Sequence, residues 1–352
     1  MNEYHNHKER LSATISWLRF PLIFLIIMLH CYSVQKMEGN HELYFKVIYP
    51  FALWLGETGV PGFFFISGFL FFLSKKSYTE KLRSRFHTLF IPYVLWNLLL
   101  LLLYIIAYAF GHPQDINGKN IVEYSFIDYL RLFWDRGSYD NGNFVPILCP
   151  LWYIRNLIIM SILSPLLYYL IRYVRDLFLI IVAVWWMTTP HNAFISQTIL
   201  FFSLGAYFAI LNKNPLETVD RNKGIFFILF SVFAIGDILS HVYIGTPINL
   251  QIHRISLIFN IPALLLLGDW CVRQGYRSKY LPNAAFIVFC AHYPIVIVIR
   301  KFSIATYSNA SDTVHILLYF ACVVISTVLS ISIYLVLNRY FPEVKKILSG
   351  NR

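Results

Sequence analysis

Charged residues are scarce in this sequence: they make up 13% of its 352 residues, about half the share usual for a soluble domain. Hydrophobic residues contribute 58% and aromatic residues 18%. A soluble protein cannot bury that much apolar surface, so a soluble enzyme and a disordered chain are both excluded. The composition favours one membrane domain, residues 1–352, that crosses the bilayer several times.

Cysteines are also few, and none of the five belongs to a Cys-X-X-Cys pair. Most of them lie in or at the edge of apolar segments, where cysteine usually behaves as a small buried hydrophobe. This pattern excludes a disulfide scaffold and a zinc framework. The histidines also lack the spacing of metal ligands, so no metal cofactor is expected.

A signal-peptide cleavage site is missing after the first apolar run, residues 15–34, so this run is predicted to remain as a transmembrane helix. Further apolar stretches approach the roughly 20 residues that a bilayer crossing needs. Together they predict an all-α, polytopic membrane protein with about ten transmembrane helices. The expected spans are approximately residues 15–34, 47–73, 88–110, 151–171, 177–189, 194–211, 224–243, 254–272, 284–302 and 313–337.

Basic residues outnumber acidic ones by 29 to 18, and they lie between the apolar spans. An even number of spans places both termini on one side of the membrane. If that side is the cytoplasm, about two thirds of the lysines and arginines face it, as the positive-inside rule requires, so we expect cytoplasmic termini. The same excess has a second interpretation, a cationic mouth for a phosphate-bearing ligand, with Lys81, Arg83 and Arg85 in its densest run.

One long connection, residues 111–150, is expected on the outer side and is too aromatic to be disordered. Two interpretations remain open for it. It is either an amphipathic segment on the membrane surface or a platform whose rings stack on an acceptor and whose carboxylates bind hydroxyl groups. Trp134 is its candidate substrate-binding residue. The aromatic and acidic or amide residues concerned are Glu123, Tyr124, Phe126, Asp128, Tyr129, Phe133, Trp134, Asp135, Tyr139, Asp140 and Asn141.

Ionisable side chains inside the expected spans are the strongest candidates for a site, because burying them in a membrane is costly. Arg19 and His30 are eleven residues apart in the first span, which places them on one helix face about 16 Å apart. Arg19 has the alternative of snorkelling to the interface, and His30 that of a structural hydrogen bond. Histidine is nevertheless suited to proton transfer near neutral pH. Glu57, Arg155 and Asp237, in the outer halves of later spans, are candidates for substrate binding.

Five sequence features occur together, in one order, between Arg19 and Pro294. They are Arg19 and His30 separated by ten residues, FFFISGFLF at 63–71, RFHTLFIPY at 85–93, PLWYIRNL at 150–157 and AAFIVFCAHYPI at 284–295. In this combination the chain resembles the acyltransferase 3 family of bacterial membrane O-acyltransferases. The resemblance is greatest to the branch with fucose O-acetylase-like and exopolysaccharide-modifying members.

The resemblance implies transfer of an acetyl or other short acyl group from cytoplasmic acyl-CoA to a hydroxyl of an extracytoplasmic glycan, at the bacterial plasma (inner) membrane. The implied donor is acetyl-CoA or another short acyl-CoA, and the implied acceptor is a cell-surface glycan or a lipid-linked saccharide. The family's essential arginine and histidine fall on Arg19 and His30, and its basic cytoplasmic motif falls on Arg85, with Arg83 beside it. Many relatives carry a C-terminal SGNH domain that is not expected here, which favours direct transfer or a separate extracytoplasmic partner.

For this chemistry we expect His30 to be the general base that removes the proton of the acceptor hydroxyl. Glu57 or Asp237 is the expected carboxylate partner of His30. Arg19 is expected to hold the donor arm or to stabilise charge at the thioester oxygen. A covalent acyl-histidine is the competing role of His30.

The phosphates of coenzyme A are expected to meet Arg85, Arg83 and Lys81, since contacts between arginine or lysine and phosphate are strong. The alternative function is a polysaccharide exporter or flippase, because ten helices with charges inside the membrane also suit a transporter. However, the sequence shows no inverted repeat, and the pair Arg19 and His30 lies within one span. Both observations favour an enzyme.

Overall fold

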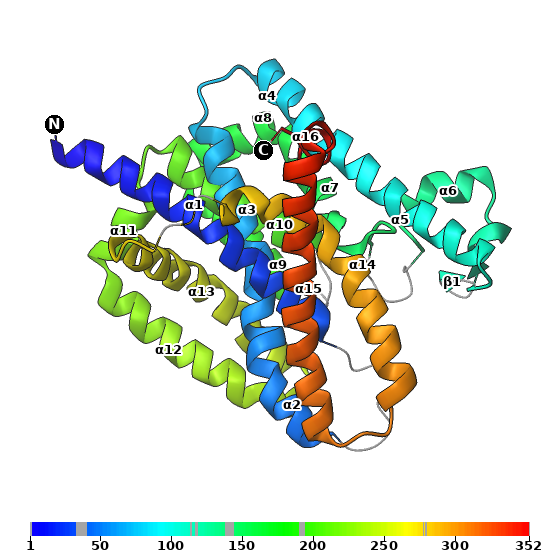
Figure 1. Ribbon diagram of the computed structural model, residues 1–352. Helices are drawn as coiled ribbons and strands as arrows, with labels where there is room; N and C mark the ends of the chain where they lie inside the picture. The colour runs from blue at the N-terminus through cyan, green and yellow to red at the C-terminus, as the bar shows by residue number, and fades with distance from the viewer. Residues whose placement is uncertain are drawn as a thin grey trace.

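The computed structural model describes residues 2–32, 41–112, 115–116, 119–137, 144–189, 194–276, 278 and 280–351. These residues are mostly helical, and the sheet among them is one antiparallel pair of two-residue strands, β1 (Asp115–Ile116) and β2 (Lys119–Asn120). The prediction of an all-α protein is therefore confirmed. Figure 1 shows the long helices gathered into one bundle, with α5, α6 and β1 on one side of it.

Seven helical stretches among the described residues are long and apolar enough to cross a bilayer. Glu9–Cys31 belongs to α1 (Asn2–Cys31). Glu42–Leu73 joins α2 (Glu42–Tyr49), the π-helical η1 (Pro50–Leu55) and α3 (Gly56–Leu73), and Tyr78–Ala109 joins α4 (Tyr78–Arg85), the π-helical η2 (Phe86–Phe90) and α5 (Ile91–Ala109). The others are α12 (Lys223–Leu239) with η7 (Ser240–Tyr243), α13 (Pro247–Arg273), α14 (Leu281–Tyr307) and α15 (Asp312–Tyr340).

Two further helix pairs reach the length of a span only when their two parts are taken together. The first, η5 (Cys149–Leu151) with α7 (Trp152–Ile162), bends by 67° into α8 (Ser164–Tyr169) and η6 (Leu170–Val174). The second, α10 (Phe194–Ile210), bends by 93° into α11 (Pro215–Arg221).

The fifth expected span corresponds to α9 (Asp176–Thr188), which has 13 residues. Such a helix is about 20 Å long, shorter than a hydrocarbon core of about 30 Å. The described residues thus form a multi-pass membrane protein with seven to nine spans. A tenth span stays a prediction.

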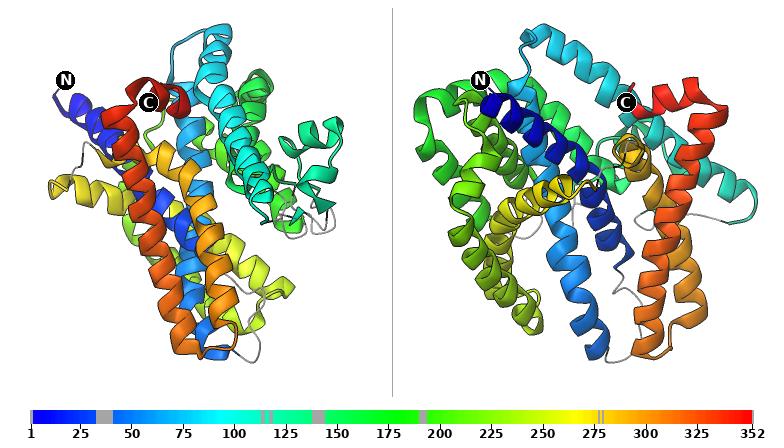
Figure 2. Two further views of the ribbon diagram at one scale, coloured as in Figure 1. Left: turned by 45° about the vertical axis from the view of Figure 1, so that its right-hand side comes forward. Right: turned by 60° about the vertical axis from the view of Figure 1, so that its left-hand side comes forward.

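Both ends of the chain lie at one end of the bundle (Figures 1 and 2). The connection between α14 and α15 lies at the opposite end, beside α2. At the end with the termini, α16 (Pro342–Ser349) returns to α5, where the indole of Trp96 donates to the Leu348 carbonyl at 3.0 Å. Arg10 of α1 forms an ion pair with the buried Asp269 of α13, with Nε 2.5 Å from Oδ1. These contacts hold the last helix to α5 and the first helix to α13.

Glycines let the backbones of α3 and α10 touch. A Cβ on Gly68 would lie 2.0 Å from the carbonyl oxygen of Phe202, and a Cβ on Gly205 would lie 1.9 Å from that of Phe65. Any side chain at these positions would push the two helices apart, as is typical of close helix pairs in membranes. The contact fixes α3, which also runs without a break through Pro61 and lines the candidate site.

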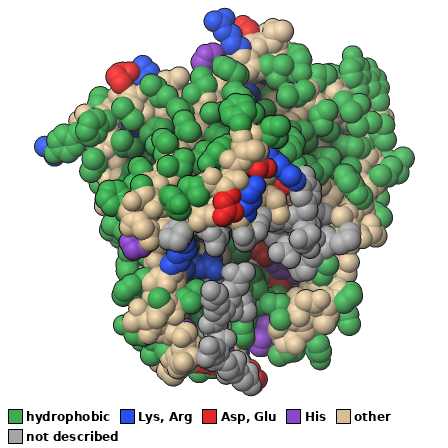
Figure 3. Space-filling view, turned by 90° about the vertical axis from the view of Figure 1, so that its right-hand side faces the viewer, with side chains coloured by type: hydrophobic (Ala, Val, Ile, Leu, Met, Phe, Trp, Pro, Cys, Tyr) green, Lys and Arg blue, Asp and Glu red, His purple; other side chains and the backbone are tan. Residues whose placement is uncertain are grey.

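Apolar side chains cover much of the molecular surface (Figure 3). On α5, for example, Leu103 and Ile106 are exposed, as expected where a helix faces lipid tails. In the loop after α5, η3 (Ile121–Glu123) leads into α6 (Phe126–Leu132), which exposes Phe126. An exposed apolar helix favours the membrane-surface interpretation of this loop. The predicted platform residues Tyr139, Asp140 and Asn141 lie outside the described residues.

Candidate active site

Two cavities lie end to end along α1 and α14. The Arg19 cavity, of about 320 Å³, is lined by Arg19, Ile23, Phe63, Ile66, Ser67, Leu70, Arg85, Leu89, Tyr153, Ile154, Leu157, Pro282, Asn283, Ala285, Phe286 and Phe289. The His30 cavity, of about 330 Å³, is lined by Leu29, His30, Tyr32, Glu57, Val60, Arg136, Val145, Cys149, Trp152, Trp186, Gln197, Leu250, His253, Arg254, Leu257, Tyr293 and Arg300. Because α1 starts at the end of the bundle with the termini, the Arg19 cavity is the nearer of the two to that end.

α1 supplies one ionisable side chain to each cavity. Arg19 and Ile23 face the first cavity, and His30, two turns beyond Ile23, faces the second. The shared helix face that the eleven-residue spacing predicts is therefore present. It is the face that α1 turns toward α14.

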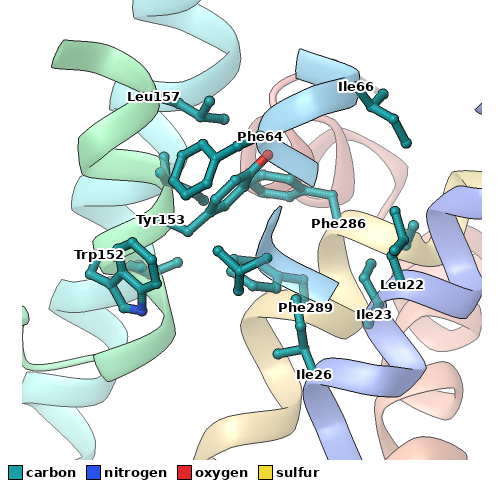
Figure 4. Packing of buried hydrophobic residues seen from close by; sticks show 14 of the residues in the cluster. Leu22, Ile23, Ile26, Phe64, Ile66, Trp152, Tyr153, Leu157, Phe286 and Phe289 are labelled. Atoms are coloured by element: carbon teal, nitrogen blue, oxygen red, sulfur yellow. The ribbon is translucent and has the colours of Figure 1, made fainter. Parts of the chain in front are cut away.

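A layer of aromatic rings separates the two cavities. Phe64, Tyr153 and Phe289 form this layer, which we call the aromatic septum; the Tyr153 ring lies 4.7 Å from that of Phe64 and 5.8 Å from that of Phe289. Figure 4 shows these side chains converging from three helices. The Tyr153 hydroxyl is also hydrogen-bonded to Ser67 at 3.0 Å.

The septum is thin. On α7, Trp152 lines the His30 cavity while the adjacent Tyr153 lines the Arg19 cavity. On α14, Phe289 and Tyr293 do the same one helical turn apart, about 6 Å along the axis. Along α14, the walls of the two cavities are therefore about one helical turn apart.

His30 lies against two rings of α14. Its ring centroid is 5.4 Å from that of His292 and 5.1 Å from that of Tyr293, which meets it edge-on. His292 is fully buried, and its Nδ1 lies 3.2 Å from the carbonyl oxygen of Val288. Sequence reasoning did not select His292 as a site residue, although the histidine stands in the middle of an apolar span.

The carboxylates expected beside His30 contact another histidine instead. His253 of α13 lies between them: its Nε2 is 3.0 Å from Glu57 Oε2, and its Nδ1 is 2.9 Å from Asp237 Oδ2. Asp237 is fully buried and also accepts a hydrogen bond from Tyr49 at 2.8 Å. Glu57 and His253 line the His30 cavity, whereas Asp237 lies behind them. The expectation that Asp237 partners His30 is thus not met in this structure, because the side chain is turned to His253 and Tyr49.

Basic residues gather at the far side of the Arg19 cavity. Arg85 lines this cavity and also a smaller one of about 200 Å³, the basic pocket, which Lys76, Lys81 and Thr88 line with it. Lys81 Nζ and Arg85 Cζ lie 5.0 and 5.5 Å from the centroid of the Phe71 ring. Arg85 therefore stands where the basic pocket meets the Arg19 cavity.

Arg83, the third predicted phosphate-binding residue, lines neither of these two cavities. The helix that carries it, α4, begins with a capping box in which the Ser77 backbone N–H donates to Glu80 at 2.7 Å. The cap fixes the start of a short helix, one face of which supplies Lys81 and Arg85. Arg83 is two residues from each of them and is exposed.

Arg155 and Trp134 are brought together, but not onto a cavity. The Arg155 guanidinium donates to the backbone carbonyls of Trp134 at 2.6 Å and Phe144 at 2.9 Å. It also lies over both rings, with Cζ 5.1 Å from the Trp134 centroid and 4.4 Å from that of Phe144. Arg155 is buried, so its contacts anchor the loop to α7. The predicted role of these two residues in substrate binding gains no geometric support.

Three arginines, none of them a predicted site residue, line the His30 cavity. Arg136 comes from the loop before η5, Arg254 from α13 and Arg300 from α14. Arg254 Nη1 donates to the carbonyls of Trp186 and Met187, at 2.6 and 3.0 Å, near the end of α9. Hydropathy gave no signal for Arg136, which lies in a loop, or for Arg300, which stands near the edge of an expected span; Arg254 is visible in the sequence as a charge at the start of the span at 254–272.

Within the described ranges, no group of three or more histidine, cysteine or acidic side chains is placed to hold a metal ion. The side chains that line the two cavities include imidazole, carboxylate and guanidinium groups. An imidazole at the wall of one cavity and a cluster of cations at the other suit proton transfer at one end and phosphate binding at the other.

Comparison with known proteins gives a consistent result. The sequence profile of the acyltransferase 3 family, described as an acyltransferase domain, matches residues 12–335. The chain is also 25% identical over 368 residues to the succinoglycan biosynthesis protein ExoH of Rhizobium meliloti (strain 1021), and the alignment covers 97% of this chain and 92% of that protein. No solved structure matches the chain.

Proposed function

The chain belongs to the acyltransferase 3 family, and from this premise we propose that it moves a short acyl group from cytoplasmic acyl-CoA to a hydroxyl of an extracytoplasmic polysaccharide. That it is a multi-pass membrane acyltransferase follows from the family and from its apolar helices. The proposal adds the donor, the acceptor and the direction of transfer. It puts the protein in the bacterial plasma membrane with the end that carries both termini in the cytoplasm.

One observation carries the proposal: a cavity with a cationic edge and a cavity with a histidine lie end to end, with only the aromatic septum between them. A reaction whose donor and acceptor are on opposite sides of a membrane requires such an arrangement. In the proposed orientation, the Arg19 cavity faces the cytoplasm and the His30 cavity faces outward. The positive-inside rule supports this orientation, because α4 and the basic pocket then face the cytoplasm.

On the donor side, Lys81 and Arg85 are proposed to bind the phosphates of coenzyme A in the basic pocket. The Arg19 cavity then receives the pantetheine arm, with Arg19 on its wall. An arginine inside a membrane span is costly unless a ligand or cavity uses its charge. Arg83, which lines neither cavity, is the weakest of the proposed donor contacts.

On the acceptor side, His30 is proposed to act as general base. Its imidazole takes the proton from the attacking hydroxyl, whose oxygen bonds to the thioester carbonyl carbon. When the C–S bond breaks, the acyl group stays on the acceptor oxygen. The thiolate of coenzyme A takes up a proton, which His30 returns. A covalent acyl-histidine at His30 is the competing route, in which the imidazole first displaces the thiolate and then passes the acyl group to the hydroxyl.

The proposed acceptor is an exopolysaccharide or its lipid-linked precursor. This rests on the similarity to a protein of succinoglycan biosynthesis, which extends over nearly the whole of both chains. Transfer within the single membrane domain of residues 1–352 is direct; a separate extracytoplasmic transferase is the alternative route for the last step.

The test is the O-acyl content of isolated surface glycans, measured by mass spectrometry in cells with the native protein or His30→Ala. The matched control is His112→Ala, which removes an exposed histidine at the end of α5 that lines neither cavity. We expect His30→Ala to lose a fixed acyl mass while glycan export continues, and the control to keep it. Equal acylation in both variants would overturn the role of His30. Lost export with normal acylation would instead favour a polysaccharide exporter.

A further inference from the structure

Two of the sequence features that carry the family resemblance meet at one hydrogen bond. Ser67 stands in FFFISGFLF at 63–71 and Tyr153 in PLWYIRNL at 150–157, and their hydroxyl oxygens lie 3.0 Å apart. Phe289, from a third of these features, lies against the same tyrosine ring at 5.8 Å. The proposed reaction gives neither hydroxyl a role. We call the side chains of Ser67 and Tyr153 the hydroxyl pair.

The hydroxyl pair lies where donor and acceptor must meet. Both of its residues line the Arg19 cavity, and Tyr153 also belongs to the aromatic septum. Figure 4 shows the Tyr153 oxygen directed away from Trp152, which lines the His30 cavity from the adjacent position on α7. A thioester in the Arg19 cavity therefore reaches the hydroxyl pair where this cavity borders the septum.

Acyl transfer from a thioester needs a hydrogen-bond donor at the carbonyl oxygen. When the acceptor oxygen bonds to the carbonyl carbon, an electron pair of the C=O bond moves onto its oxygen and leaves a negative charge there. Apolar side chains such as Phe63 and Leu70 form much of the wall of the Arg19 cavity, and an unpaired charge in such surroundings is costly. The acyl-histidine route produces the same charge when the imidazole adds to the carbon, so both routes need the donor.

Other donors on this wall lie farther from the reacting atoms. The side chains with N–H or O–H groups that line the Arg19 cavity are Arg19, Ser67, Arg85, Tyr153 and Asn283. Arg85 also lines the basic pocket. Asn283 precedes Phe289 by six residues of α14, about 9 Å along the axis, and Arg19 precedes His30 by eleven residues of α1, about 16 Å. Among the described residues of this wall, the hydroxyl pair supplies the donors at the septum.

The pair is built so that one hydroxyl supports the other. The Tyr153 oxygen also lies 3.5 Å from the carbonyl oxygen of Phe63, at the long limit of a hydrogen bond. With the Ser67 O–H donated to the Tyr153 oxygen, rotation about the phenolic C–O bond turns the Tyr153 proton from this distant carbonyl to a ligand. Ser67 is itself held in place, because the adjacent Gly68 packs directly on the backbone of Phe202. Such a preorganised donor suits an oxyanion.

We propose that Tyr153 is a catalytic residue, whose hydroxyl donates a hydrogen bond to the thioester carbonyl oxygen as that oxygen becomes negative, and that Ser67 positions it. This rests on the proposed function, because it assigns roles in the same reaction. Tyr153 keeps its proton throughout. When the C–S bond breaks, the electron pair returns to the carbonyl and the acyl group stays on the acceptor oxygen. The thiolate takes the proton that His30 removed from the hydroxyl.

The experiment measures kcat and KM for the full-length protein in lipid nanodiscs, with the cell's own de-O-acylated glycan as acceptor. The donor is acetyl-CoA or succinyl-CoA, whichever the native protein transfers faster. The variants are Tyr153→Phe, which keeps the ring of the septum and removes only the hydroxyl, Ser67→Ala and Ser67→Thr. The matched controls, Tyr334→Phe and Ser330→Ala, remove the same two groups from buried positions one turn apart on α15 that line neither cavity.

We expect Tyr153→Phe to lower kcat about 100-fold, the size of one lost oxyanion donor, with KM for the acyl-CoA unchanged. Ser67→Ala should lower kcat about tenfold, because Tyr153 keeps its hydroxyl but loses the hydrogen bond that supports it. Ser67→Thr retains a hydroxyl and should recover most of the rate. Both controls should keep the native kcat.

An infrared measurement separates this role from a structural one. The acyl-CoA is isotopically labelled at the thioester carbonyl carbon and bound in the absence of acceptor. Its carbonyl band should lie at a lower frequency in the native protein than in Tyr153→Phe, because a hydrogen bond to the oxygen weakens the C=O bond. Tyr334→Phe should give the native band.

Equal kcat in Tyr153→Phe and Tyr334→Phe, or the native carbonyl band in Tyr153→Phe, overturns the inference. The comparison of Ser67→Ala with Ser330→Ala tests the pair even where Tyr153→Phe fails to fold, and equal rates there overturn it as well. A native protein that transfers no acyl group from either CoA ester contradicts the proposed function instead, so the two failures are distinguishable.

Discussion

His30 and His292 form a pair across the contact between α1 and α14, with ring centroids 5.4 Å apart and ring planes tilted by 35°. Only His30 reaches the cavity; His292 is completely buried behind it. The Nδ1 of His292 is engaged by the Val288 carbonyl, and its Nε2 has no hydrogen-bond partner among the described residues. A buried polar atom without a partner is costly and calls for an explanation.

The pair leads to the first prediction. With Nδ1–H donated to Val288, Nε2 of His292 is a proton acceptor, and a small rotation of His30 brings an N–H of its charged form toward it. We expect His292→Asn, which mimics only the Nδ1 side, to lower kcat about tenfold or more. His292→Gln, which places an amide oxygen near the Nε2 position, should keep most of the activity.

The measurement that separates these roles is the pH dependence of kcat. If His292 acts through His30, the pH at which kcat rises should differ between His292→Asn and the native protein, while KM for acyl-CoA stays unchanged. Equal activity of the Asn and Gln variants, or an unshifted profile at reduced rate, would show that His292 only fills space.

A second prediction concerns the donor phosphates. Arg85→Gln and Lys81→Gln should raise KM for acyl-CoA about tenfold with little change in kcat, because both side chains line the basic pocket. Arg83→Gln is the matched comparison and should have a smaller effect: it removes the same charge from the same helix at a position off both cavities. The readout is KM in detergent-solubilised enzyme at two salt concentrations, since screening weakens exposed contacts. An equal effect of Arg83→Gln would place the donor elsewhere on α4.

A third prediction tests the hydrogen-bonded group of Glu57, His253 and Asp237. His253→Ala leaves the buried Asp237 carboxylate without its imidazole, which should cost about 3–5 kcal/mol of stability. Tyr49→Phe removes the hydrogen bond to Asp237 and the one that the hydroxyl accepts from Asn249, and should cost about 1–2 kcal/mol because both partners keep other hydrogen bonds. Thermal unfolding in detergent measures both. If His253→Ala has the same melting temperature as the native protein, the hydrogen-bonded group does not stabilise the fold and its role is in the chemistry alone.

The fourth prediction concerns the close contact of α3 and α10. Gly68→Ala places a Cβ 2.0 Å from the Phe202 carbonyl oxygen, so the helices must separate and the protein should be destabilised by several kcal/mol. Gly224→Ala on α12 has nothing within 4 Å of the new Cβ and should be neutral or stabilising by up to about 1 kcal/mol. Thermal unfolding of the two variants, side by side, checks the contact. Equal melting temperatures would mean that the helices are farther apart than described.

The sequence was sufficient to predict the helical segments and to place Arg19 and His30 on one face of α1. Hydropathy reports the length of apolar runs, and a charge within such a run stands out. It did not predict the bends after α7 and α10 or the π-helical turns, because these depend on how helices pack rather than on composition. The short helix α9 shows the same limit, because an apolar run in the sequence does not reveal whether its helix is long enough to cross the membrane.

The grouping of side chains was harder to predict. His253 and Glu57 are separated by 196 residues in the chain, and His253 stands one residue before the expected span at 254–272. Arg155 shows the same limit: a buried arginine in the outer half of a span predicts a ligand contact, and in the structure its guanidinium donates to the carbonyls of Trp134 and Phe144. A sequence shows that a charge is buried but not what it faces.

The aromatic septum also has an electrical consequence. When water fills both cavities, the insulating part of the membrane at this point is reduced to roughly the thickness of a few rings, and most of the membrane voltage then falls across Phe64, Tyr153 and Phe289. A charge that crosses this layer therefore experiences nearly the full potential, about 2.3 kcal/mol for each elementary charge at 100 mV. In the proposed orientation, an inside-negative voltage assists the outward passage of a negatively charged acyl group and leaves that of a neutral one unaffected.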